Sequence, residues 1–502
     1  MFVTVFTTGA AVMMIEIVGA RVIGPVFGVG LYVWSALLTI TMGALAFGYY
    51  AGGVASERAM SARLMGAVVC ASGVLLALVR VLRHPILAAT LPLGPRWGSL
   101  TSAALLFGPC LIALGMVGPI AVRLTIKAVH GAGRSVGSVY AVSTAGSLVG
   151  ALAGGFLIVP LFDTDAILTA AACILLLLGA GSLFLRERRA AAALILVPWF
   201  TSAASTRPLP SGIEIIAKSQ SLYGLVEVIA DQNRAVRFLR SDHSIVGAQF
   251  VADGSPGFEF VYLIEAVRFF RPDAKRMLNI GLGIGSAPSG LGKLGFKVDV
   301  VEIDPAVLQF ARQYFGYSPT GEVHVEDART FVNRTEQRYD VIVHNTFTGG
   351  GAPEHLLSVE AITQIRALLR RSGVLVLNFP GYAAGPNAEA SFAVARTLRA
   401  VFPTVRVFSD TLTGSPPDTV GNLIFFASDG ALQFCIPPAY RFENPIEEQA
   451  CRSLESREVL KQVPGGAAIT DAKNPLARLQ IPIAEKHFAA MNELLPVEVW
   501  LN

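Results

Sequence analysis

Long apolar runs fill the first 206 residues, whereas shorter apolar and polar blocks alternate over the rest of the chain. A helix needs about 20 mainly apolar residues to cross the hydrocarbon core of a bilayer. We therefore expect a multi-pass α-helical membrane domain over 1–206, inserted in the cell membrane with the lipid bilayer as its partner. The predicted spanning helices cover 2–24, 31–53, 64–82, 100–121, 136–160 and 165–185.

The pattern changes after a stretch rich in Pro, Ser and Gly at 205–212, which is typical of a linker. Alternating apolar and polar positions at 225–230 and 235–240 predict a small N-terminal β-region within 207–270. Over 271–502, apolar strands alternate with helical stretches, which predicts an α/β, Rossmann-like, doubly wound sheet. Its strands are expected at 276–280, 297–303, 322–326, 339–344, 373–379, 404–408 and 422–427.

The charges follow the same division. Residues 1–206 hold 12 Lys/Arg and 5 Asp/Glu, and the rest of the 40 basic and 36 acidic residues make the second block slightly acidic. The basic residues lie at the ends of apolar segments and not in a stripe interleaved with aromatics, so nucleic-acid binding is not expected. With five cysteines and no CxxC pair, neither a zinc site nor a disulfide framework is expected.

The placement of Lys and Arg predicts the orientation of the helices, because cytoplasmic loops are enriched in these residues. Under a six-helix count, the N-terminus and the basic linkers at 58–63, 123–134 and 186–189 fall on one side, which we expect to be cytoplasmic. The opposite loop at 83–99, which carries Arg83 and Arg96, is an exception. The short apolar segment 190–206 leaves two alternatives: it spans and places the second block outside, or it lies on the surface and leaves that block in the cytoplasm.

Two charged residues, Glu16 and Arg21, interrupt the first apolar run. A charge at membrane depth is costly and commonly functional. The two side chains also have a structural interpretation, in which they pair with each other or with a neighbour and Arg21 reaches toward a helix end. Both interpretations stay open.

The first predicted strand of the sheet runs into the sequence NIGLGIGS, whose glycines Gly281, Gly283 and Gly285 allow a tight turn and the close approach of a ligand. Glu302 ends the second strand, where a carboxylate can accept hydrogen bonds from both ribose hydroxyls of an adenosine group. Asp327 follows the third strand and suits the adenine amino group. Each residue also has a structural interpretation, as a turn glycine or a helix cap. Their order at successive strand ends favours a nucleoside site.

Four segments of the second block, NIGLGIGS, VVEID, VEDA and YDVIVHNTF, resemble the spermidine synthase group of aminopropyltransferases, within the class I S-adenosylmethionine-dependent methyltransferase fold. The resemblance covers about 215–430, and ITDAKNPL at 469–476 resembles a later segment of the same group. The first block resembles the multi-pass segment of bacterial membrane-bound members, in which Glu16, Arg21 and the run at 47–53 are landmarks.

The resemblance implies cofactor contacts at Gly281, Gly283, Glu302, Asp327 and Ala328. It implies decarboxylated S-adenosylmethionine, or S-adenosylmethionine itself, as a co-substrate without a metal. The implied acceptor is a small-molecule amine. Because S-adenosylmethionine is made in the cytosol, the resemblance also favours a cytoplasmic catalytic domain.

Three positions depart from the family pattern. Asn345 stands where the family carries a catalytic aspartate beside the acceptor amine, and an amide cannot take a proton at neutral pH. Ile284 replaces an acidic residue of the glycine loop, and Tyr223-Gly224 replaces a tyrosine–glutamine pair. A polycationic acceptor favours surrounding carboxylates, so these departures count against aminopropylation of putrescine.

Three residues are candidates to act at the acceptor in place of the missing aspartate. His344 titrates near neutral pH but also suits a structural role, and Asp471 also suits a turn or a helix cap. Tyr262 matches a tyrosine that lies near the acceptor in the family, but an aromatic on an apolar helix also suits a core. Glu354 and His355 follow a glycine-rich turn, and we interpret them as a lid over the pocket.

Three functions follow as alternatives. The first is a membrane-anchored, spermidine-synthase-like aminopropyltransferase with an amine acceptor. The second is methyl transfer from S-adenosylmethionine, or its cleavage, with a less cationic and lipid-like acceptor presented by the membrane helices. The third is a non-catalytic transporter or sensor of polyamines or nucleosides. A homo-oligomer is compatible with each.

Overall fold

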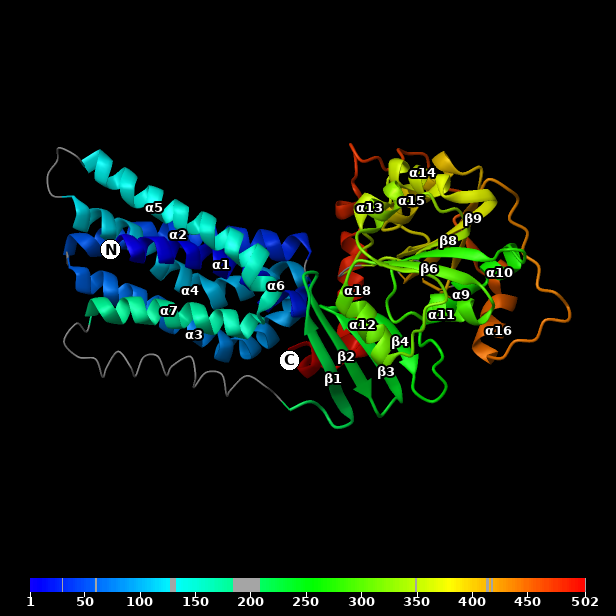
Figure 1. The fold of residues 1–502 in the computed structure, drawn as a ribbon, viewed down its shortest axis with the longest axis horizontal. Helices are drawn as coiled ribbons and strands as arrows, with labels where there is room; N and C mark the ends of the chain where they lie inside the picture. The colour runs from blue at the N-terminus through cyan, green and yellow to red at the C-terminus, as the bar shows by residue number, and fades with distance from the viewer. Residues whose placement is uncertain are drawn as a thin grey trace. The chain divides into compact units, whose positions relative to one another are not determined.

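Two compact units make up the fold, one formed by Met1–Pro210 with Leu495–Asn502 and the other by Ser211–Leu494. The basic cluster at 186–189 and the apolar segment 190–206 lie outside the described residues, and the predictions for them stay predictions. Figure 1 shows the computed structural model, which describes residues 1–28, 30–58, 61–126, 132–183, 208–347, 350–411, 415–416 and 419–501.

The apolar runs of the first unit form long helices at the predicted places (Figure 1). These are α1 (Phe2–Phe27), α2 (Leu31–Arg58), α3 (Ala62–Thr90), α4 (Gly94–Thr125), α5 (Ala132–Ala153), α6 (Val159–Leu161) and α7 (Thr164–Leu183). The predicted segment 136–160 is divided, because a π-helical turn at Gly154–Ile158 separates α5 from α6. Among the described residues, five helical segments are long and apolar enough to cross a membrane. The count is one lower than predicted because α3 and α4 form a single segment, Ala62–Thr125, through a 3-10 turn at Leu91–Leu93.

Glycines let the helices of this unit approach one another at backbone distance. A Cβ atom at Gly146 of α5 would lie 2.0 Å from the backbone oxygen of Phe6 in α1. A Cβ atom at Gly48 of α2 would lie 2.4 Å from the backbone oxygen of Ile112 in α4. Any side chain at these positions would push the helix pairs apart, so both contacts depend on glycine.

Two contacts define which helix ends share a side of this unit. The Thr125 hydroxyl donates to Met1 Sδ at 3.4 Å, so the N-terminus and the end of α4 lie together, as a six-helix count requires. Arg83 and Arg80 in the second half of α3 pair with Asp165 in the first turn of α7, at 2.6 and 3.3 Å. Arg83, the exception to the charge pattern, is therefore compensated by an acidic partner. The side that faces the cytoplasm stays a prediction.

The C-terminal residues differ from the predicted domain boundary, which assigned 271–502 to the α/β domain. Helix α19 (Val497–Leu501) belongs to the first unit, where it packs against α1 and α3. Trp500 is 1% exposed, and its indole nitrogen donates to the backbone oxygen of Leu495 at 3.2 Å. A buried apolar anchor of this kind holds the chain end on the helical unit.

The second unit begins with the predicted small β-region. It is a four-stranded antiparallel sheet in sequential order, made of β1 (Ile213–Gln220), β2 (Leu225–Asp231), β3 (Val236–Ser241) and β4 (Ser244–Phe250). Short helices α9 (Phe260–Glu265) and α10 (Val267–Phe270) lead from it into the larger sheet.

The larger sheet has the order β12-β10-β11-β9-β8-β5-β6-β7 and confirms every predicted strand. Strands β5 to β9 are parallel, whereas β11, β10 and β12 extend the edge in antiparallel pairs, so the parallel part of the sheet ends at β9. The strands are β5 (Arg276–Ile280), β6 (Lys297–Glu302), β7 (Val323–Val325), β8 (Tyr339–His344), β9 (Leu369–Tyr382), β10 (Thr404–Ser409), β11 (Val420–Ser428) and β12 (Glu458–Val459).

Helices cover both faces of this sheet. Neighbouring residues of a strand enter opposite cores, because strand side chains alternate: Met277 belongs to one buried cluster and Leu278 to the other. The covering helices are α11 (Ser286–Lys293), α12 (Pro305–Tyr314), α13 (Ala328–Arg334), α14 (Val359–Ala367), α15 (Glu389–Val401), α16 (Pro445–Arg452), α17 (Leu476–Leu479) and α18 (Ile481–Leu494). This arrangement leaves the carboxyl ends of the neighbouring strands β8, β5, β6 and β7 as the place for a ligand.

Candidate nucleoside and acceptor site

The glycine loop between β5 and α11 needs its glycines for conformation as well as for space. Gly281, Gly283 and Gly285 have φ angles of 85°, 56° and 80°, in the left-handed region that favours glycine. A Cβ atom at Gly281 would lie 2.3 Å from the backbone oxygen of Asn345, so the loop passes directly beside the end of β8. The prediction that these glycines form a tight turn is confirmed.

Glu302 joins the glycine loop to the end of β6. Its carboxylate is 8% exposed and accepts from the backbone N–H of Leu282 at 2.8 Å and from that of Asp304 at 2.9 Å. Burial raises the pKa of Glu302, although these two backbone donors favour the ionised form. Each carboxylate oxygen has a second acceptor position, which fits the predicted contact with the ribose hydroxyls.

Asp304 extends this network to the small β-region. It caps α12 through the backbone N–H of Ala306 at 2.9 Å and accepts from the hydroxyl of Ser221 at 2.6 Å. The neighbouring Gly224 has a φ of 147°, and a Cβ atom there would lie 2.2 Å from a carboxylate oxygen of Asp242. A side chain at this position would therefore collide with Asp242.

Asp327 caps α13 with one oxygen and faces a histidine with the other. Its Oδ1 accepts from the backbone N–H of Thr330 at 2.9 Å, and its Oδ2 lies 3.4 Å from His355 Nε2. Partial burial acts to raise the pKa of Asp327, but the bonds from Thr330 and His355 outweigh it and lower the pKa. The capping role is confirmed. The adenine contact stays a prediction, as does that of Ala328, the first residue of α13.

Asn345, which the sequence analysis predicts to replace a catalytic aspartate, is held by a second amide. Its backbone N–H donates to Ile280 at 2.9 Å, and its side-chain oxygen accepts from Asn378 Nδ2 at 2.9 Å. Asn378 is 6% exposed and ends the apolar part of β9. The sequence analysis missed Asn378, although an asparagine within an apolar strand is a signal of a specific hydrogen bond.

His344 lies at the end of β8 and is 1% exposed. Its Nδ1 lies 3.4 Å from the hydroxyl of Thr346, and burial lowers the pKa of its imidazole to about 4. The ring is therefore neutral at pH 7 and a weak proton acceptor. The role of His344 as a base stays a prediction, and its low pKa in the buried site does not favour that role.

His487 of α18 is half-buried and lies against the loop that follows β8. Its Nε2 lies 3.0 Å from the hydroxyl of Ser244 in β4, and its ring is 4.9 Å from the ring of Phe347 in an edge-on arrangement. Burial lowers the pKa of His487 to about 4. No local pattern in the sequence joins His487 to Phe347, so this contact was missed.

The remaining candidates have partners of their own. Asp471 forms a bidentate ion pair with Arg329, one bond of which is 2.8 Å, and this pair lowers the pKa of Asp471 to about 2. Tyr262 belongs to a buried core, and its hydroxyl accepts from Asn444 at 3.0 Å. Burial, with nearby acidic groups, raises the pKa of Tyr262 to about 12. The structural interpretations of both residues are supported by these contacts.

The predicted lid residues are tied to α13. Besides its contact with Asp327, His355 accepts at its backbone oxygen from Arg329 Nη1 at 2.7 Å. The backbone oxygen of Glu354 accepts from Asn474 at 3.0 Å. Ile284 of the glycine loop is 5% exposed and packs against Gly247 of β4, where an added Cβ atom would lie 2.5 Å from it. Within the described ranges, no three His, Cys, Asp or Glu side chains are grouped to hold a metal ion.

Known proteins resemble this chain over the same region. Residues 261–414 match the spermine/spermidine synthase domain. An N-terminal histidine N-methyltransferase from Emericella nidulans is 29% identical over 344 residues, which cover 60% of this chain and 60% of the relative. A polyamine aminopropyltransferase from Vibrio vulnificus is 38% identical over 175 residues, covering 33% of this chain and 58% of the relative.

A solved spermidine synthase from Thermotoga maritima has a TM-score of 0.39 and 20% identity, covering 48% of this chain and 83% of its own. The chain spans about 60% of the length of the two curated relatives named above. The match to the domain model and the strand order agree with the resemblance found in the sequence. Residues 261–414 of the second unit therefore form a spermidine synthase-like domain of the class I methyltransferase fold.

Proposed function

We propose that this protein binds an adenosyl sulfonium compound at the carboxyl ends of β5, β6 and β7 and transfers a methyl group from S-adenosylmethionine to an uncharged nitrogen. The cofactor supplies an electrophilic carbon, so the protein acts chiefly by positioning. Glu302 would hold the ribose hydroxyls, and Asp327 the adenine. The bare backbone at Gly281, which a Cβ atom would obstruct, fits a ligand in close contact.

The observation that carries the choice of acceptor is the amide of Asn345 and its bond to Asn378. Deprotonating an ammonium group needs a proton acceptor, and an amide offers none. A nitrogen with a free lone pair, such as that of a neutral imidazole, needs no proton removed before it attacks. Its lone pair forms the bond to the methyl carbon as the carbon–sulfur bond breaks. The electron pair stays on sulfur in S-adenosylhomocysteine, and water takes the ring proton afterwards.

The residues around Asn345 support an uncharged acceptor. Ile284 is apolar, and the imidazoles of His344 and His487 are neutral at pH 7 because their pKa values are lowered to about 4 by burial. A polyamine carries several positive charges and would need carboxylates around it. Positions 345 and 284 hold an amide and an apolar side chain instead. The similarity to a relative described as an N-terminal histidine N-methyltransferase supports an imidazole-bearing acceptor.

Aminopropyl transfer from decarboxylated S-adenosylmethionine to an amine is the second candidate. The match to the spermine/spermidine synthase domain and the 38% identity to a polyamine aminopropyltransferase favour it. In both cases the first unit would anchor the enzyme in the cell membrane through its apolar helices, with the second unit in the cytoplasm where S-adenosylmethionine is made.

Product analysis tests the proposal. The full chain, in lipid nanodiscs, is incubated with either cofactor form and with putrescine or a peptide that begins with histidine. S-adenosylhomocysteine together with a methylated imidazole supports methyl transfer. Methylthioadenosine with an aminopropylated amine supports the second candidate and overturns the first. Cofactor binding by calorimetry without either product overturns both and favours a sensor.

A further inference from the structure

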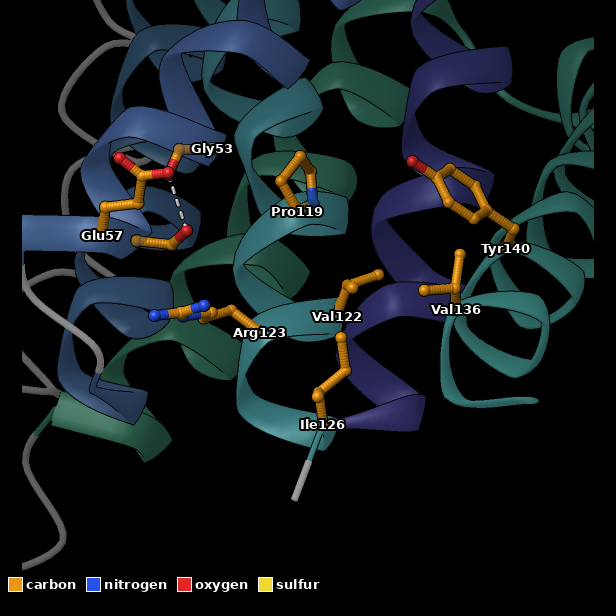
Figure 2. Close-up of a pocket in the computed structure, with 9 residues that line it drawn as sticks. Gly53, Glu57, Pro119, Val122, Arg123, Ile126, Val136 and Tyr140 are labelled. Atoms are coloured by element: carbon orange, nitrogen blue, oxygen red, sulfur yellow. Dashed lines mark hydrogen bonds between the residues drawn. The ribbon is translucent and has the colours of Figure 1, made fainter. Parts of the chain in front are cut away.

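A cavity of about 330 Å³ lies in the first unit. Figure 2 shows that its lining comes from three helices: the last turns of α2 and α4 and the first half of α5. Because α2 and α4 both end here, the cavity lies at one end of the helical bundle. If the helices span a bilayer, as proposed above, this is the depth of the lipid headgroups.

The cavity has one acidic and one basic side chain. Glu57 extends from the end of α2 and Arg123 from the last turn of α4 (Figure 2). Both residues are exposed, and neither has an ion-pair partner among the residues that the structure describes. The nearby hydroxyl of Ser56 is already used, because it donates to the backbone oxygen of Gly53 at 2.7 Å.

The rest of the lining is apolar and aromatic. Pro119 and Val122 of α4 face Val136 of α5, and the half-exposed ring of Tyr140 borders the same space. A lining of this kind accommodates hydrocarbon next to a polar headgroup. The cavity therefore joins an apolar wall to one positive and one negative charge.

We propose that this cavity binds the headgroup of a zwitterionic aminophospholipid, such as phosphatidylethanolamine. The guanidinium of Arg123 pairs with the phosphate, as Arg does in charge-assisted contacts with phosphate oxygens. The carboxylate of Glu57 accepts from the primary ammonium group. The acyl chains follow the apolar wall.

The charge pair discriminates between headgroups. Phosphatidylglycerol has the phosphate but no ammonium group, so Glu57 would repel it. Phosphatidylcholine has the positive charge but no N–H donor for the carboxylate. Arg58 follows Glu57 and is basic, but it does not line the cavity, so it serves as a control for general attraction of phosphate.

The test measures lipid retention by the full chain in nanodiscs made from equal parts of the three phospholipids. Native mass spectrometry is expected to show phosphatidylethanolamine retained at least fivefold over the other two. Arg123→Gln is expected to remove retention of all three lipids. Glu57→Gln is expected to abolish the preference over phosphatidylglycerol, and Arg58→Gln to change neither.

Two results would overturn the inference: equal retention of the three lipids by the wild type, or an unchanged preference in both Arg123→Gln and Glu57→Gln. A parallel arm uses inorganic phosphate and glycerophosphoethanolamine as competitors, and displacement by phosphate alone would mean a simple anion site. The inference rests on the proposed membrane anchoring. Alkaline carbonate extraction of the chain from membranes tests that anchoring separately, and the product assay tests the chemistry separately.

Discussion

Asn378 donates from its side-chain amide to the side-chain oxygen of Asn345 at 2.9 Å, so two amides meet at the end of β8. Asn378 comes from β9 and Asn345 from the loop after β8, and these strands are parallel neighbours. The amide of Asn345 is thus held in one orientation beside the glycine loop. Because an amide takes no proton at neutral pH, this positioned group cannot act as a base.

Asn345→Asp is expected to restore a proton acceptor without loss of the bond from Asn378. If the site retains the geometry of an aminopropyltransferase, formation of methylthioadenosine from decarboxylated S-adenosylmethionine and putrescine rises at least tenfold, since a general base contributes about 10²–10⁴ to rate. Methyl transfer to the uncharged acceptor changes little. Quantifying both nucleoside products by chromatography checks this, and Asn345→Ala, which should show no such rise, is the control.

Glu302→Gln is expected to weaken cofactor binding at least tenfold. Glutamine has one acceptor oxygen, so the backbone N–H of Leu282 or of Asp304 loses its partner, and the ribose loses a charged acceptor. Calorimetry with S-adenosylhomocysteine gives the affinity. The matched control is Glu326→Gln, because Glu326 pairs with Arg334 near the surface. The affinity of this variant for S-adenosylhomocysteine should change less than twofold. Equal losses in the two variants would contradict the role of Glu302.

Gly281→Ala is expected to abolish cofactor binding, because the new Cβ atom would lie 2.3 Å from the backbone oxygen of Asn345 and displace the loop after β8. Gly295→Ala is the control for backbone strain alone. Gly295 has a φ of 89° and open space around its Cβ position, so this change should lower stability by about 1 kcal/mol and leave binding intact. Calorimetry measures cofactor binding by both variants and so separates the steric clash from backbone strain. Intact binding in Gly281→Ala would contradict the predicted clash with Asn345.

Two histidines with lowered pKa values, His344 and His487, make the stability of the second unit dependent on pH. The pKa values of His344 and His487 fall from 6.5 in the unfolded chain to about 4 in the fold, so the unfolded state binds more protons between these values. Their contribution is complete above pH 6.5 and is lost as the pH falls toward 4. At 1.36 kcal/mol per pKa unit, each ring accounts for up to about 3 kcal/mol.

Hydrogen exchange of the amides in β8 and α18, corrected for the intrinsic rate, measures this effect. Protection is expected to fall at least tenfold between pH 7 and pH 5 in the wild type. His487→Gln should show about half of that dependence, because one of the two rings is gone. If His487→Gln kept the full pH dependence of the wild type, His487 would be ruled out as a contributor.

The strands, the apolar helices and the glycine turn could all be predicted from the sequence, because each depends on local patterns. Apolar runs of spanning length define the helices, and alternating short blocks define the sheet. The glycines of NIGLGIGS are required by their own φ angles. The candidate positions Asn345 and Ile284 could be named from the sequence as well, because both lie within or directly after short motifs.

The partners of those residues were decided by the tertiary structure alone. Asn378, His487 and Ser244 lie on separate elements, and no periodicity in the sequence records which of them meet. The same holds for helix α19, where three apolar residues at the chain end carry no local sign that they are buried on the helical unit. Burial decides the chemistry as well, since the two imidazoles are neutral because of their surroundings. Local patterns specify elements, whereas long-range packing sets which side chains meet and in which charge state they do so.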